Sequence, residues 1–230
     1  MLIVQVYVDH IIFGAIADSL CEEFAKLMGS EFEMSMMGEL NFFLGLQVKQ
    51  SIKETCISQQ KYIKELLKGF DMEASKVIDT PIATATKLDM DDSGSLINQI
   101  MYRGIIRSLL YLTTSRPDIV FSVGLCARFQ SNPKESHLKA ARRILRYLKG
   151  THDLVLYYPS SGNFNLIGYV DADYAGYLVD RKSISRMAHF LGSCLILWGI
   201  RKQNSLDLST AEVEYVAATS CCAQLLWIKQ

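Results

Sequence analysis

Carboxylates stand at the ends of predicted strands and at the start of a predicted helix, where they could hold a divalent cation. Asp9 follows an apolar run, Asp171 and Asp173 follow another, and Glu214 lies near the start of a helical pattern. Carboxylate oxygens suit Mg²⁺, and phosphoryl-transfer sites need such groups fixed around metal ions. The sequence therefore contains three candidate positions for metal-dependent chemistry, and each pattern by itself is only a weak indication of a metal site.

The first place is a predicted hairpin. Apolar runs at residues 2–8 and 11–15 flank Asp9 and His10, which favours two strands with these two polar residues at the tip. One aspartate is not a complete metal site. A plain polar turn is the more common explanation, because turns favour aspartate.

The second place is the end of the strand predicted over residues 165–171. Alternation puts Asp171 and Asp173 on the same face of the chain. Paired carboxylates at a strand end suit magnesium, but the same short pattern is frequent in surface turns. The pair by itself leaves both explanations open.

At the third place, the start of the predicted helix over residues 209–229, two glutamates differ in the structural roles available to them. Ser209 and Glu212 have the spacing of a capping box, so Glu212 has a structural role available. Glu214 has no such role and shares a small-residue face with Ala218 and Cys221. A glutamate on a packed face is costly without a partner, and a metal would supply one. A partly exposed glutamate at the helix start is the more common case.

The helix predicted over residues 131–149 is strongly basic on one side. Its apolar side carries Leu138, Ala141, Leu145 and Leu148. Its basic side carries Lys139, Arg142, Arg143, Arg146 and Lys149. Such a face can follow a phosphate backbone, although basic solvated faces are common.

Periodicity and turn signals predict the elements that must position these residues. The predicted strands cover residues 2–8, 11–15, 42–49, 52–58, 154–158, 165–171, 186–191 and 194–198. The predicted helices cover about 18–28, 58–70, 97–114, 117–128, 131–149 and 209–229. A structure-poor bridge over residues 77–94 marks the clearest boundary in the first half of the chain.

Composition excludes several classes of protein. The 230 residues contain 24 Lys and Arg against 24 Asp and Glu, so attraction to nucleic acid must come from local patches. Six cysteines without paired spacing argue against a zinc site and for reduced thiols of an intracellular protein. The sequence has no apolar run long enough to span a bilayer, no signal-peptide pattern, no nucleophile elbow and no phosphate-cradling glycine loop.

Seven stretches, taken in order, carry a resemblance to a known family. They are YVDHIIFG (7–14), GELNFFLGLQV (38–48), SQQKYIKELLKGF (58–70), YRGIIRSLLYLTTSRPDI (102–119), HLKAARRILRYLKGT (137–151), YVDADYAGYLVDRKS (169–183) and STAEVEY (209–215). Together they resemble the reverse transcriptase–ribonuclease H region of a copia-type LTR retrotransposon Pol polyprotein. The resemblance covers essentially the whole chain.

This resemblance implies an α+β fold in three parts. Residues 1–85 are expected to be the end of a polymerase palm with a thumb, and residues 86–150 a helical connection. Residues 151–230 are expected to be the first part of a ribonuclease H-like domain, a mixed sheet with a helix. We expect the rest of the palm to lie before Met1 and the rest of the ribonuclease H domain to follow Gln230.

The resemblance also implies the chemistry. Asp9 matches the first aspartate of the polymerase turn, and Asp171 and Glu214 match two of the four ribonuclease H carboxylates around Mg²⁺ or Mn²⁺. The implied partners are an RNA–DNA hybrid or primer-template and the remainder of the Pol polyprotein, whose activities include DNA integration, with no membrane. The implied location is intracellular, in cytoplasmic virus-like particles or the nucleus.

Several residues depart from the family pattern. His10 stands where the turn has a second aspartate, and it removes a negative charge and an oxygen ligand. Arg107 and Arg186 stand at usual glycine positions, where they threaten close packing or a positive-φ backbone, and Asp207 stands at a small apolar one. We therefore predict an ancestral polymerase and ribonuclease H with neither activity in this chain, and metal bound weakly.

Two alternatives stay open from the sequence. The chain is either a non-catalytic nucleic-acid-binding remnant working through the basic helix, or a slice of a larger active polyprotein in which Asp171 and Glu214 form half of a live site. The final helix is also expected to leave apolar surface exposed around Leu225, Leu226 and Trp227. That surface predicts poor solubility or association in isolation.

Overall fold

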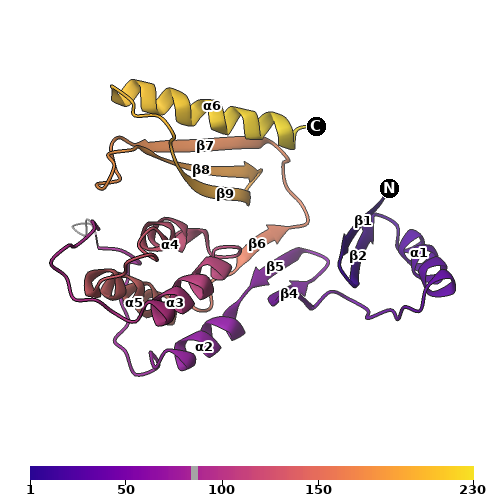
Figure 1. Ribbon diagram of the computed structural model, residues 1–230. Coiled ribbons are helices and arrows are strands. Elements are labelled where there is room, and N and C mark those ends of the chain that lie inside the picture. The colour runs from indigo at the N-terminus through magenta and orange to yellow at the C-terminus, as the bar shows by residue number, and fades with distance from the viewer. Residues whose placement is uncertain (84–87) are drawn as a thin grey trace.

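The computed structural model describes residues 1–83 and 88–230, in which helices pack with three small antiparallel sheets (Figure 1). The strands are β1 (Leu2–Tyr7), β2 (His10–Ala15), β3 (Phe42–Phe43), β4 (Leu46–Gln50), β5 (Glu54–Ser58), β6 (Leu156–Pro159), β7 (Leu166–Asp173), β8 (Ile184–Leu191) and β9 (Cys194–Lys202). The helices are α1 (Asp18–Glu31), α2 (Gln60–Gly69), α3 (Gln99–Leu112), η1 (Pro117–Ile119), α4 (Val120–Ala127), α5 (Glu135–Gly150) and α6 (Thr210–Ile228). The α+β class predicted from the sequence is confirmed.

The β1–β2 hairpin and α1 form an outlying unit, seen at the right of Figure 1. The rings of Phe13 and Phe24 meet edge to face at 4.9 Å and join the hairpin to the helix. None of the first 47 residues is buried, and Ile3, Val6 and Val8 remain largely exposed on the hairpin. The unit therefore has little core of its own.

A second sheet joins distant parts of the chain. Its strand order is β3-β4-β5-β6, and β6 pairs antiparallel with β5, with Ile57 opposite Leu156. The sequence analysis grouped the strand predicted over residues 154–158 with the C-terminal region. The structure instead places this strand in the sheet of the first half, because it satisfies the free edge of β5.

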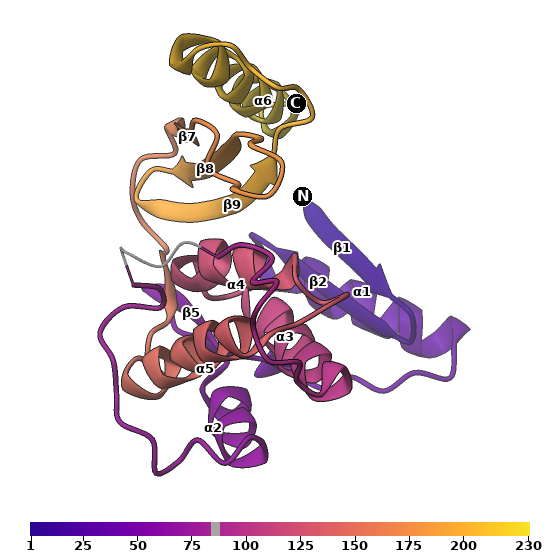
Figure 2. The same cartoon turned by 60° about the vertical axis from the view of Figure 1, so that its left-hand side comes forward.

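The main core lies among α2, α3, α4 and α5. Ile105, Leu109 and Leu112 recur at helical spacing along α3 and are almost completely buried against the neighbouring helices. Close packing of such side chains is the main source of stability in a domain of this size. Figure 2 shows these helices gathered on one side of the three-stranded sheet, with α6 on the other.

The C-terminal sheet has the strand order β7-β8-β9, and both of its pairings are antiparallel. We predicted a mixed sheet here, and for these strands that prediction is wrong. Loops and tight turns connect the three strands, and such links join antiparallel neighbours, whereas parallel pairs need a crossover. Helix α6 lies along β7 and β8 (Figure 1).

Predictions for α1, the end of α6 and Arg107 are confirmed in part. Helix α1 continues past Gly29 to Glu31, because the glycine keeps a helical backbone there. Leu226 and Trp227 are each 67% exposed, as expected, whereas Leu225 is partly buried. Arg107 is exposed on α3, so the predicted threat to close packing does not arise there. In the part of the chain that the structure describes, no helix is long and apolar enough to cross a membrane.

Candidate functional site

The first candidate residue, Asp9, lies in the turn of the β1–β2 hairpin. Tyr7 pairs with His10, so the two loop residues are Val8 and Asp9, and His10 is already the first residue of β2. We predicted His10 at the tip, and the register corrects this by one residue. Val8 takes a φ of +51°, a conformation that is unfavourable for a β-branched side chain.

His10 is the partner of the Asp9 carboxylate. Its Nδ1 lies 2.8 Å from Asp9 Oδ1, and both side chains are more than half exposed. The hydrogen bond from His10, aided by its charge, lowers the pKa of Asp9 from the ordinary value of 3.8. One carboxylate oxygen of Asp9 is therefore already engaged by the neighbouring His10.

The second candidate residue, Asp171, lies on β7 directly opposite Arg186 on β8. Arg186 Nη1 is 3.2 Å from Asp171 Oδ2, and Arg186 Nη2 is 3.5 Å from Asp173 Oδ2. The guanidinium also lies 4.2 Å from the ring centre of Phe121 on α4. A single cation from the protein thus bridges the two carboxylates.

Asp171 points away from α6. A Cβ built on Gly168 would lie 2.8 Å from Cys221 Sγ, so Gly168 faces α6. Side chains three positions apart on a regular strand project to opposite faces. Asp171 therefore lies on the other face of the sheet, toward α4, which agrees with the contact between Arg186 and Phe121.

The third candidate residue, Glu214, is exposed at the start of α6. The buried stripe of α6 is Val213, Ala217 and Cys221, and Glu214 lies beside it rather than on it. Ser209 Oγ accepts a hydrogen bond from the Glu212 N–H at 3.2 Å, which confirms the predicted cap. The Glu212 carboxylate accepts from the N–H of Leu208, not from that of Ser209 as a standard capping box would have it.

The carboxylates do not come together as a metal site. Divalent cations need several oxygen ligands at about 2.0–2.6 Å. Asp171 and Glu214 lie on opposite sides of the sheet, and Arg186 takes the position between Asp171 and Asp173. Among the residues that the structure describes, no three His, Cys, Asp or Glu side chains converge to hold a metal ion. The residues present do not fit Mg²⁺.

The basic side of α5 is largely engaged with residues 73–80, here called the linker segment. Arg143 donates to Thr80 O at 3.2 Å and to Thr80 Oγ1 at 2.8 Å. Arg146 donates to the carbonyl of Lys76 at 2.7 Å. Lys149 donates to the carbonyls of two further linker residues, at 2.5 and 2.8 Å. Three of the five basic residues therefore hold the linker segment against the helix.

Lys139 and Arg142 are the two basic residues of α5 that make no hydrogen bond to the linker segment. Lys139 forms a surface ion pair with Glu135 at 2.8 Å, and Arg142 is exposed. An exposed pair of this kind is worth little free energy. These two cations remain accessible to a partner.

Sequence reasoning missed an ion pair beside α5 between a buried arginine and a partly exposed aspartate. Arg116 is 2% exposed and donates to both carboxylate oxygens of Asp118, at 3.0 and 2.7 Å, and to Thr151. Burial by itself would raise the pKa of Asp118, but the hydrogen bonds and charge of Arg116, with the Tyr147 hydroxyl, outweigh it and lower the pKa. The sequence analysis predicts only that a helix begins at about residue 117 in this stretch.

Comparison with known proteins decides the family. A family model described as "Reverse transcriptase (RNA-dependent DNA polymerase)" matches residues 1–84. The "Retrovirus-related Pol polyprotein from transposon RE1" of Arabidopsis thaliana is 34% identical over 97% of the chain. The chain belongs to the copia-type retrotransposon Pol family. Residues 1–84 of this Pol chain form a reverse-transcriptase-like region.

The chain matches only a small part of the Pol polyproteins, but nearly all of another relative. The Pol polyprotein from transposon TNT 1-94 of Nicotiana tabacum is 31% identical over 100% of the chain. The chain spans only 15% of RE1 and 18% of TNT 1-94. An uncharacterized mitochondrial protein of Arabidopsis thaliana is 30% identical over 96% of the Pol chain and 92% of its own length. No solved structure matches the chain.

Proposed function

We propose that this Pol chain derives from a reverse transcriptase–ribonuclease H region and lacks metal-dependent catalysis at both inherited positions. One observation carries the proposal: Arg186 bridges Asp171 and Asp173. Asp171 stands where the ribonuclease H family has its first metal-binding carboxylate. A fixed guanidinium between the carboxylates neutralises the charge that would attract Mg²⁺ and repels a second cation.

The polymerase turn supports the same proposal. Asp9 hydrogen bonds to His10, which stands in place of a second carboxylate. An imidazole is a softer ligand than a carboxylate and carries no negative charge, so it suits Mg²⁺ poorly. Mg²⁺ or Mn²⁺ is then a cofactor of the ancestral enzyme that this chain binds weakly.

The test uses the purified chain with a primed RNA template and with an RNA–DNA hybrid, in Mg²⁺ and in Mn²⁺. We expect neither primer extension nor cleavage of the RNA strand. Hybrid cleavage that requires Mg²⁺ and disappears in Asp171→Asn would overturn the ribonuclease H part. Primer extension that disappears in Asp9→Asn would overturn the polymerase part.

A second candidate function is non-catalytic binding of an RNA–DNA hybrid, supported by the exposed Lys139 and Arg142 on α5. The double variant Arg142→Glu, Arg143→Glu is a poor test, because Arg143 also holds Thr80 of the linker segment. Lys139→Glu with Arg142→Glu leaves the linker contacts intact. We expect this variant to weaken hybrid binding and to flatten its salt dependence. Unchanged binding would count against the second candidate.

A further inference from the structure

A hollow of about 230 Å³ lies beside α5. Its lining includes the charged side chains of Lys139, Arg143 and Arg146, with the Ser136 hydroxyl among the polar groups. Among the residues that the structure describes, none of those lining it is acidic. These positions recur every three or four residues, so they form one continuous stripe along the helix.

The two arginines of this hollow are held in place by the linker segment. Arg143 uses its Nε and Nη2 on Thr80, and Arg146 uses its Nε on the carbonyl of Lys76. Within the described residues, no hydrogen bond takes Nη1 of Arg143 or either Nη of Arg146. These donors are preorganised, so little rotamer entropy remains to be lost when they bind an anion.

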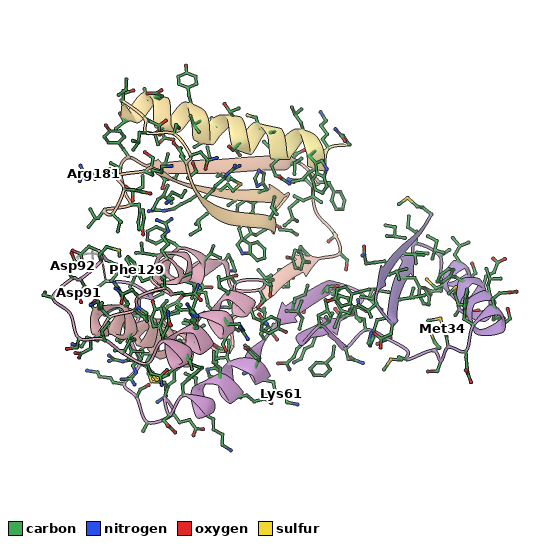
Figure 3. The ribbon with its side chains drawn as sticks, viewed as in Figure 1. Met34, Lys61, Asp91, Asp92, Phe129 and Arg181 are labelled. Atoms are coloured by element: carbon green, nitrogen blue, oxygen red, sulfur yellow. The ribbon has the colours of Figure 1, made fainter. Side chains whose placement is uncertain are left out.

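The two other polar groups at this hollow have acidic neighbours. Lys139 pairs with Glu135 at the surface, and Ser136 Oγ donates to Asp91 Oδ2 at 2.5 Å. Figure 3 labels Asp91 in the loop that precedes α3. Glu135 pairs weakly because both partners are exposed, so Lys139 is available to a stronger acceptor. The lining carries three positive charges, and the two neighbouring carboxylates, Glu135 and Asp91, contact Lys139 and Ser136 rather than the two arginines.

We propose that this hollow, lined by Ser136, Lys139, Arg143 and Arg146, is a binding site for a single phosphate group. Guanidinium groups match phosphate oxygens in geometry, and charge-assisted hydrogen bonds to them are strong. The volume exceeds that of several water molecules, each of about 30 Å³, so a phosphate fits. The site is separate from Asp9, Asp171 and Glu214 and does not depend on metal chemistry there.

The test is a titration of the whole chain with inorganic phosphate and pyrophosphate, followed by the backbone amide NMR signals. We expect saturable shifts centred on residues 136–146. Lys139→Gln is expected to weaken binding about tenfold, the loss of one charge-assisted hydrogen bond. Arg142→Gln removes the same charge from the same helix outside the hollow, and it is expected to change affinity by about twofold or less. Thermal unfolding checks that both variants are folded.

The outcomes distinguish specific binding of phosphate in the hollow from general electrostatic attraction to the basic side of α5. Absence of saturable shifts in the natural chain, or equal weakening by Lys139→Gln and Arg142→Gln, would overturn the proposal. A second titration uses a short RNA–DNA hybrid. If Lys139→Gln weakens binding of the hybrid as well, the phosphate belongs to a nucleic-acid backbone. If the hybrid fails to displace bound pyrophosphate, the site takes a free phosphate or a small phosphorylated molecule.

Discussion

Arg186 on β8 and Asp171 on β7 are direct cross-strand neighbours, and their charged groups lie 3.2 Å apart. Opposite charges at such positions stabilise a strand pair by a modest amount. The contact also changes what Asp171 can do, because its carboxylate now has a permanent cation as partner. Under the proposed function, a carboxylate at a former metal-binding position has become part of a structural ion pair.

The pair formed by the buried Arg116 and the partly exposed Asp118 is expected to be the most important ion pair for stability. Asp118→Asn leaves a 2%-exposed guanidinium without its charged partner, at a cost of about 3 kcal/mol in the free energy of unfolding. Urea unfolding measures this loss. Asp153→Asn changes an exposed aspartate and is the control, with an expected effect below about 0.5 kcal/mol. Equal effects of the two variants would contradict a stabilising role for the ion pair of Arg116 and Asp118.

The same pair predicts how stability depends on pH. Because folding lowers the pKa of Asp118 below its ordinary value of 3.8, the stabilisation is fully present above that value. It is lost as the pH falls through the lower pKa of the folded state. Unfolding measured from pH 6 down to pH 2 should show a smaller loss in Asp118→Asn than in the natural chain. Parallel curves would show that Asp118 does not contribute.

Gly168 is expected to be required for the packing of α6 on the sheet. In Gly168→Ala the new Cβ meets Cys221 Sγ at 2.8 Å and Leu225 Cδ1 at 2.9 Å, which should cost about 1–3 kcal/mol of stability. Gly199→Ala on β9 has nothing within 4 Å and should be tolerated. Thermal unfolding compares the two. A Gly168→Ala chain as stable as Gly199→Ala would argue against this packing.

The contacts between α5 and the linker segment predict a local effect. Lys149→Met keeps the aliphatic stem but removes both hydrogen bonds to linker carbonyls, at a cost of about 1–3 kcal/mol. Limited proteolysis should then cut within residues 73–80 faster than in the natural chain. Arg142→Met removes an exposed cation from the same helix and should leave the cutting rate unchanged. Similar cutting rates in both variants would show that the hydrogen bonds of Lys149 do not hold the linker segment.

The hairpin turn predicts a shift that NMR can detect. The hydrogen bond from His10 lowers the pKa of Asp9, so His10→Ala should return this pKa toward 3.8. A carbon-detected titration of the Asp9 carboxyl measures the change. His152→Ala removes a histidine outside the hairpin and should leave the Asp9 pKa where it is. An Asp9 pKa that does not respond to His10→Ala would exclude the contact.

Local patterns predicted the order and type of most elements, because hydrophobic periodicity and capping residues act over a few positions. The hairpin of β1 and β2, the amphipathic helices α2 and α5, and the Ser209 cap of α6 all follow from such signals. The predictions that failed concern strand register or contacts between residues that are far apart in the sequence. The offset of one residue that moves His10 out of the turn is such a case.

The candidate site shows the same limit. The sequence marked Arg186 as unusual, but only the pairing of β7 with β8 brings it to Asp171. The basic stripe of α5 was visible, yet its contacts join residues 63 to 76 positions apart and leave no local signal. Pairing of β6 with β5 likewise joins segments about a hundred residues apart. Such relations depend on the tertiary fold rather than on neighbouring residues.

The central claim is that Arg186 occupies the place a divalent cation would take beside Asp171, and calorimetric titration with Mn²⁺ tests it most directly. The natural chain is expected to show no binding that depends on Asp171, whereas Arg186→Gly should gain a site that disappears again when Asp171→Asn is added. Saturable Mn²⁺ binding by the natural chain, abolished in Asp171→Asn, would contradict the account.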